Sequence, residues 1–276
     1  MRKKLVIVLC LALSALAQGV TAGPPESAPA LTITDRQLEW VGGQVFRNEC
    51  SSRQSCLVHW NRGEHFPSLG IGHFIWYPEG VDGRFVESFP SLVTYMGTQG
   101  VDLPDWLARQ APAGAPWPDR DAFLQAEQSD PRIRQLRQLL ADQQATQAAF
   151  LLLRAREALN DVAAASANPD RTQEKINGLT ATPGGIYALI DYVNFKGEGL
   201  AESERYQGLG WGLLQVLEAM PGEASPRDTV LQQFREAAAY VLARRAEGSG
   251  RDIEKDQWLP GWLKRVNTYR EPSSAP

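Results

Sequence analysis

The residues best suited to chemistry are Glu49 and the segment 67–73, which reads Pro-Ser-Leu-Gly-Ile-Gly-His. Leu38, Val41 and Val45 have the spacing of one helix face, and Glu49 continues the same stripe. A carboxyl group at the end of such a stripe is turned towards the core, where burial favours its protonated form. A helix end that holds a proton donor ahead of a glycine-containing hairpin is the arrangement expected of a glycosidase cleft.

Two elements must position these residues. A first helix is predicted to begin at a cap provided by Thr34 or Asp35 and to run to about residue 49. Residues 57–77 are rich in β-branched and aromatic types, and the sequence Asn-Arg-Gly at 61–63 is typical of a turn. This stretch therefore predicts a hairpin that follows the first helix directly.

The remainder of the chain is predicted to be helical, apart from a proline-rich loop at 111–118. Capping residues and apolar spacing place helices after Asp130-Pro131, at 145–165, from Thr182-Pro183 to Gly197, at 211–220, and from Ser225-Pro226 to 246. The fold class predicted is mainly α (α+β), with a small N-terminal β-hairpin region and a larger helical lobe.

The first residues have the pattern of a secretory signal peptide. Three basic residues at 2–4 precede an apolar run that is too short to cross a bilayer, and small residues at 20–22 fit a cleavage site. The chain is thus expected to be periplasmic or extracellular, without a stable membrane anchor. Removal of 1–22 leaves 25 basic against 32 acidic residues, so the net charge falls from −4 to −7, which disfavours nucleic acid as a partner.

The predicted signal peptide and the predicted helices together give the domain organisation. Residues 1–22 are assigned to the signal peptide and 23–33 to a flexible leader. Residues 34–270 are expected to form a single domain with a helical insertion around 84–180, and 271–276 a tail.

Cleavage of the signal peptide removes Cys10. The exported chain then has two cysteines, Cys50 and Cys56, in an oxidising compartment. A disulfide between them is expected, with two buried free thiols as the alternative. The loop is short, so the bridge would contribute about 2 kcal/mol by chain entropy. Since Cys50 follows Glu49, the bridge would also fix the chain where it leaves the helix.

Residues 68–73 resemble the Thr-Ile-Gly-x-Gly-His segment of phage-type lysozymes, or endolysins, within the lysozyme-like superfamily. Residues 186–195 are similar to the long central helix of that family, and 259–265 to its late Pro-Gly-Leu-x-x-Arg segment. The resemblance implies a lysozyme-like fold and hydrolysis of β-1,4 bonds in peptidoglycan without a cofactor. It assigns Glu49 as the catalytic acid and puts Ser68 in the position of the family's threonine.

The chain departs from that family at the second carboxylate. The family has an aspartate six residues before its threonine, where this chain has Arg62. Glu64, four residues before Ser68, is the nearest acidic residue and our candidate for the base that activates water. The Ser68 hydroxyl is expected to orient that water.

Two alternatives to Glu64 stay open from the sequence. Asn61 and Ser68 could hold the water by themselves, with Glu64 only a solvated charge at the hairpin tip. Otherwise Glu198 or Asp191 could act as the base from the facing lobe.

Substrate contacts are expected from aromatic and polar side chains, with Trp76 and Tyr77 as further stacking candidates. The residues predicted to bind substrate are Trp60, Asn61, His73, Asn194, Glu198, Tyr206, Trp211 and Gln215. The basic residues Lys264, Arg265 and Arg270 either face an anionic glycan or pair with Asp191.

The three histidines, His59, His65 and His73, raise the possibility of a zinc peptidase, but their spacing fits neither an HExxH helix nor a Cys/His finger, so no metal is predicted. His73 is expected to pair with an acidic residue. Gly70 and Gly72 predict a bend or a close backbone approach, because a phosphate loop would need a following Lys-Ser or Lys-Thr. Two other functions remain: hydrolysis of a different amino-sugar polymer such as chitosan, or an inert glycan-binding or envelope scaffold protein.

Overall fold

The computed structural model describes residues 33–83, 85–221 and 229–273 of the 276-residue chain, all within one compact unit, Leu31–Pro276. The predicted signal peptide, most of the leader and the last three residues lie outside these ranges. Helices dominate the described residues, which confirms the mainly α class. None of these helices combines the length and the apolar character that a membrane crossing requires.

Helix α1, Asp35–Cys50, carries Glu49 in its last turn. Its cap is Thr34, one of the two predicted candidates: the Gln37 backbone N–H donates to Thr34 Oγ1 at 3.3 Å, and the Thr34 N–H donates to Gln37 Oε1 at 2.9 Å. The helix ends where Ser51 adopts a left-handed conformation with φ 49°. The predicted helix is therefore confirmed.

The predicted hairpin is a three-stranded antiparallel sheet of very short strands. β1 (Val58–His59) pairs with β2 (Ser68–Leu69), and β2 pairs with β3 (Phe74–Ile75). Ser68 lies opposite His59 on one side and Ile75 on the other, so it occupies the middle of the sheet. The loop from β1 to β2 contains the predicted turn at 61–63.

The two glycines after β2 allow the chain to approach a buried side chain. Gly70 has φ 71°, and a Cβ atom there would lie 2.2 Å from Gln147 Oε1. Gln147 is fully buried, and its Oε1 accepts a hydrogen bond from the Ile71 N–H at 2.9 Å. A Cβ atom at Gly72 would lie 2.7 Å from the Phe74 ring. The prediction of a close backbone approach is thus confirmed.

The other elements are the helices after the sheet and a second small strand pair, β4–β5. Their bounds are α2 Phe89–Thr98, α3 Asp105–Gln110, α4 Arg120–Ser129, α5 Pro131–Asp142, α6 Gln144–Ala165, α7 Pro169–Thr180, α8 Pro183–Lys196, β4 Arg205–Tyr206, β5 Leu209–Gly210, α9 Leu213–Ala219, α10 Val230–Gly248 and α11 Leu259–Val266. Short single turns are η1 Gln54–Leu57, η2 Ala111–Ala113, η3 Glu202–Glu204 and η4 Glu254–Trp258.

One predicted helix start is corrected, and another lies outside the described residues. Helix α9 begins at Leu213, because Gly212 is extended and caps it, so Trp211 precedes the helix. Helix α10 begins at Val230, where the Thr229 hydroxyl accepts a hydrogen bond from the Gln232 N–H. The predicted start at 225–226 lies outside the described residues.

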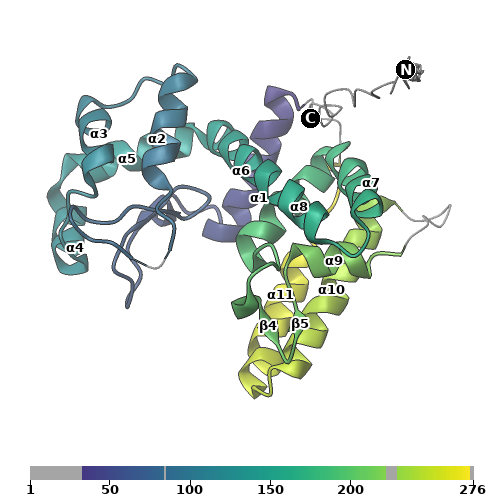
Figure 1. Cartoon of the computed structure of the whole chain (residues 1–276). Helices are drawn as coiled ribbons and strands as arrows, with labels where there is room; N and C mark the ends of the chain where they lie inside the picture. The colour runs from purple at the N-terminus through teal and green to yellow at the C-terminus, as the bar shows by residue number, and fades with distance from the viewer. Residues whose placement is uncertain (1–32, 84, 222–228, 274–276) are drawn as a thin grey trace, which may run out of the picture. The chain divides into compact units, whose positions relative to one another are not determined.

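Helix α6 links the two groups of helices. It packs along α1, and it contacts α2 and α5 on one side and α7, α8 and α9 on the other (Figure 1). Its buried residues, among them Phe150, Leu151 and Leu152, join the main hydrophobic core. Part of the range predicted as an insertion, 84–180, therefore belongs to the core that supports α1 and the sheet.

Cys50 and Cys56 lie at disulfide-bonding distance, with their Cα atoms 5.4 Å apart. We expect unreduced peptides from protein exported to the periplasm to contain this bridge, because the two side chains already face each other across a short loop. Mass spectrometry of a proteolytic digest, with and without reductant, measures it. Two thiols that react with iodoacetamide in native protein would contradict the bridge.

Candidate active site

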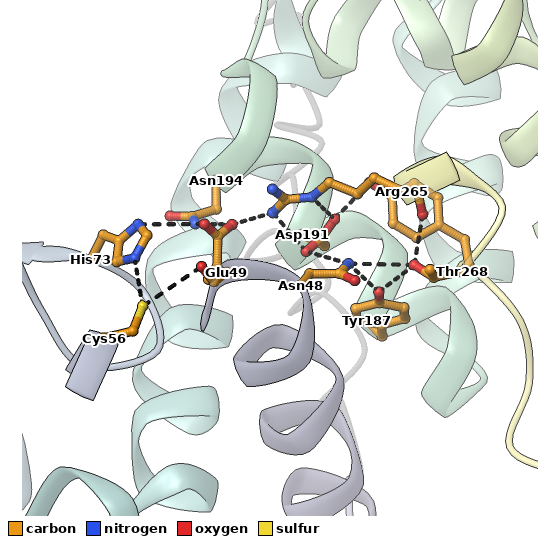
Figure 2. A network of polar contacts seen from close by, with 10 residues as sticks. Asn48, Glu49, Cys56, His73, Tyr187, Asp191, Asn194, Arg265 and Thr268 are labelled. Atoms are coloured by element: carbon orange, nitrogen blue, oxygen red, sulfur yellow. Dashed lines mark hydrogen bonds and ion pairs between the residues drawn. The ribbon is translucent and has the colours of Figure 1, made fainter. Parts of the chain in front are cut away.

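Glu49 is held by three side chains from three different parts of the chain. Arg265 Nη2 donates to Glu49 Oε1 in a short contact, and Asn194 Nδ2 donates to the same oxygen at 3.2 Å. His73 Nδ1 lies 3.4 Å from Glu49 Oε2 (Figure 2). The Glu49 side chain is only 10% exposed, so the expectation that the end of the apolar stripe is sheltered is confirmed.

Asp191, in α8, lies behind Arg265 and is fully buried. Its carboxylate accepts from Arg265 Nε at 2.8 Å, Arg265 Nη2 at 2.9 Å, Tyr269 Oη at 2.8 Å and Asn48 Nδ2 at 3.2 Å. These charge-assisted bonds satisfy a buried anion. The neighbouring carboxylates raise the pKa of Arg265 despite its burial. Of the two predicted roles for Arg265, pairing with Asp191 is confirmed.

This network fixes the last turn of α1 on the helical lobe. Asn48, next to Glu49, also donates to Tyr187 Oη at 2.5 Å and Thr268 Oγ1 at 3.3 Å. Thr268 Oγ1 donates to the Arg265 backbone carbonyl at 2.6 Å. The Glu49 carboxyl group therefore occupies a defined position because its neighbour and its partner are both anchored (Figure 2).

His73 pairs with an acidic residue, as expected, and that residue is Glu49. Burial is the largest effect on His73 and lowers its pKa; His59 and Arg265 lower it further, while Glu49 and Glu64 oppose them. His73 is thus neutral at neutral pH, so its contact with Glu49 is between a neutral ring and the carboxyl group. The residue has φ 47°, so the turn after Gly72 directs its ring towards Glu49.

Glu64, the candidate base, lies in the β1–β2 loop and is bound by the two residues predicted to act with it. Asn61 Nδ2 donates to Glu64 Oε2 at 3.2 Å, and Ser68 Oγ donates to the same oxygen at 3.5 Å. The buried Trp60 donates its indole N–H to the Glu64 carbonyl at 2.8 Å. These three contacts restrain Glu64, whereas a freely solvated residue at a hairpin tip would have no such partners.

Both carboxylates open into one pocket with a volume of about 460 Å³. The pocket includes every residue predicted for the catalytic step, together with Asn61, His73 and Asn194 from the predicted substrate set. Its lining is Glu49, Asn61, Glu64, Phe66, Ser68, Gly72, His73, Ile75, Phe85, Asn194, Phe195 and Arg265. Residues separated by more than 200 positions in the sequence thus meet at one site.

Asn194 also lines a neighbouring pocket of about 480 Å³, which contains Glu198. Burial raises the pKa of Glu198, and the nearby Glu204 and Asp161 raise it further. Glu198 therefore lies next to the Glu49 pocket but does not line it. Asp191 lines neither pocket, and its four bonds leave it no capacity to activate water.

The sugar contacts predicted for four aromatic residues are corrected because their rings are buried inside the protein. Trp60 and Trp211 are 5% and 6% exposed, and Trp76 and Tyr77 are also buried, so none offers a ring face to a glycan. Tyr206 donates its hydroxyl to Glu254 at 2.8 Å. The Gln215 side chain binds the backbone of Gly199 and Gly212.

The aromatic residues at the pocket are three phenylalanines that the sequence analysis missed: Phe66, Phe85 and Phe195. Phe85 is 46% exposed and packs edge-on against Phe66. Phe85 lies in a loop, where the sequence has no helical or strand periodicity from which its exposure could be predicted. Phe195, in contrast, follows the predicted Asn194 directly, and this adjacency was the available clue.

Among the described residues, the group whose ligand atoms lie close enough for a metal ion contains only one of the three histidines. Cys50, Cys56 and His73 form the group within the described ranges whose ligand atoms lie within 4.8 Å of one another. The two sulfurs are at bonding distance to each other, and a disulfide has no thiolate for a metal. The structure therefore gives no positive support to a zinc peptidase.

Comparison of the chain with protein-family profiles, with characterised proteins and with solved structures finds no match in any of the three.

An Asp191→Asn variant is expected to lower the free energy of unfolding by about 3 kcal/mol, because it removes the charge of the fully buried Asp191 and leaves the largely buried Arg265 under-compensated. Urea denaturation followed by circular dichroism measures the change, with the exposed Asp102→Asn as the control. Equal stability of the two variants would show that the pair contributes little.

Proposed function

We propose that this chain is an extracytoplasmic glycoside hydrolase of the lysozyme-like type, which cleaves β-1,4 bonds of peptidoglycan. The observation that carries the proposal is the shared pocket of Glu49 and Glu64, two carboxylates from different elements with separate sets of partners. General acid–base hydrolysis of a glycosidic bond needs two such groups.

In this mechanism Glu49 donates its proton to the glycosidic oxygen and Glu64 accepts one from the attacking water. Asp191 largely compensates the positive charge of Arg265. The guanidinium can therefore orient Glu49 through a hydrogen bond without presenting a full positive charge to it. A glycan that fills the pocket also excludes water from around the carboxyl group, which strengthens its interaction with the glycosidic oxygen. Ser68 Oγ, beside Glu64 Oε2, is available to orient the water.

The pocket next to Glu49 favours one second candidate, hydrolysis of a cationic amino-sugar polymer such as chitosan. Glu198 and Glu204 line that pocket, with Arg154 as the opposing charge. Two carboxylates beside a glycan path attract ammonium groups.

The test is release of reducing ends from purified cell walls and, separately, from chitosan by the mature protein, together with turbidity clearing of the walls. Cleavage of cell walls supports the proposal, and cleavage of chitosan alone supports the second candidate. Folded protein that binds either polymer without cleaving it would overturn both and favour an inert glycan-binding protein.

A further inference from the structure

A further pocket, distinct from the one that contains Glu198, adjoins the Glu49 pocket and shares Phe195 and Arg265 with it. Its volume is about 600 Å³. We call it the basic pocket, and its lining residues are Arg47, Asn48, Ser51, Phe195, Gly261, Trp262, Lys264, Arg265 and Thr268. Asn48 precedes Glu49 in the chain, so a ligand in the basic pocket would lie one residue from the proposed catalytic acid.

The lining of the basic pocket contains three cationic side chains and no carboxylate. Arg265 is paired with Asp191 and Glu49, but Arg47 and Lys264 are exposed. No described carboxylate lies within 4.0 Å of either. The whole chain has a net charge of −4, so two unpaired cations in one pocket are a local feature that favours an anionic ligand.

Two further basic residues lie against Trp262. Lys196 Nζ lies 3.5 Å from the centre of the Trp262 ring, and the Arg245 guanidinium lies 4.9 Å from it. Burial lowers the pKa of Lys196 to about 6, and Arg245 and Arg265 lower it further against the opposing effect of Glu254. Lys196 is therefore mostly neutral at neutral pH, and Arg245 is paired with Glu254 at 3.1 Å, so the positive charge offered to a ligand comes from Arg47 and Lys264.

We propose that the basic pocket binds a carboxylate-bearing peptide branch of the glycan during cleavage. Arg47 and Lys264 would contact the carboxylates, while the half-buried Phe195 offers apolar surface to the methyl groups of the branch. The peptide stem of peptidoglycan has both features, whereas chitosan carries ammonium groups and no carboxylate. This inference rests on the proposed function and narrows its substrate to glycan with acidic stems.

The experiment measures binding apart from hydrolysis. Protein carrying Glu49→Gln is pelleted with purified sacculi, either intact or stripped of their peptide stems by an amidase. Into this background we would introduce Arg47→Gln with Lys264→Gln, and as a matched control Arg36→Gln with Lys255→Gln. All four residues are exposed and each pair removes two positive charges.

Apparent affinity for intact sacculi is expected to fall about tenfold in the Arg47/Lys264 pair and to stay near that of the background in the control pair. On stripped sacculi the difference between the two pairs should disappear. Equal losses in both pairs, or an Arg47/Lys264 loss that is just as large on stripped sacculi, would overturn the stem site. A stem-dependent loss in a protein whose unmutated form cleaves no wall would retain the binding site and reject the hydrolase.

Discussion

Replacement of Glu49 by glutamine is expected to lower the rate of wall hydrolysis by about a thousandfold. The carboxamide keeps the size of the side chain but has no acidic proton for the glycosidic oxygen, and general acid catalysis typically contributes effects of this size. The fold should survive, because Arg265 retains its two hydrogen bonds to Asp191 and Asn48 still anchors the end of α1. Reducing-end release from purified sacculi measures the rate.

Glu39→Gln is the matched control, since Glu39 lies on the same helix and is exposed. It removes the same charge without touching the pocket, and its rate should equal that of the unmutated protein. A well-folded Glu49→Gln protein that hydrolyses walls at the rate of this control would reject Glu49 as the acid.

Replacement of Glu64 by glutamine is expected to lower kcat by about two to four orders of magnitude with little change in KM. Activation of water is needed only in the transition state, so the loss should appear in kcat. The amide can keep hydrogen-bonding contact with Asn61 and Ser68, which preserves the loop. Steady-state kinetics on soluble glycan fragments separate the two parameters.

Glu79→Gln serves as the control for this second variant, because Glu79 is an exposed residue shortly after the sheet. If Glu64→Gln keeps a kcat close to that of Glu79→Gln, Asn61 and Ser68 hold the water without a carboxylate, or Glu198 reaches it from the adjoining pocket. Glu198→Gln then distinguishes these two explanations. Asp191 is already a poor candidate because it is buried and fully bonded.

Local features of the chain were predictable because they depend on neighbours in sequence. The capped start of α1, its end near Glu49, and the helices that begin at Pro131 and Pro183 follow from capping residues and apolar spacing. The Cys50–Cys56 pair follows from a six-residue separation. The grouping of Glu49, Glu64 and Ser68 was also predicted, since the α1 end and the sheet are adjacent in the chain.

The aromatic residues show where sequence reasoning was wrong. Trp60 and Trp211 were predicted to stack on sugars, but large rings gain most from burial and both lie in the core. The exposed Phe85 lines the pocket instead. Whether a ring faces solvent depends on packing across elements, which periodicity within one element does not encode.

The sequence by itself determined where the first helix ends, that Glu49 lies there, and that a short glycine-containing sheet follows. Only the tertiary structure decided the partners of that carboxyl group: Arg265 lies 216 residues away, and Asp191 lies 74 residues before Arg265. It also decided that Arg47 and Lys264 share a pocket without a carboxylate. Helix ends and short loops are set by local conformational preferences, whereas a buried charge finds its partner only when distant segments pack together.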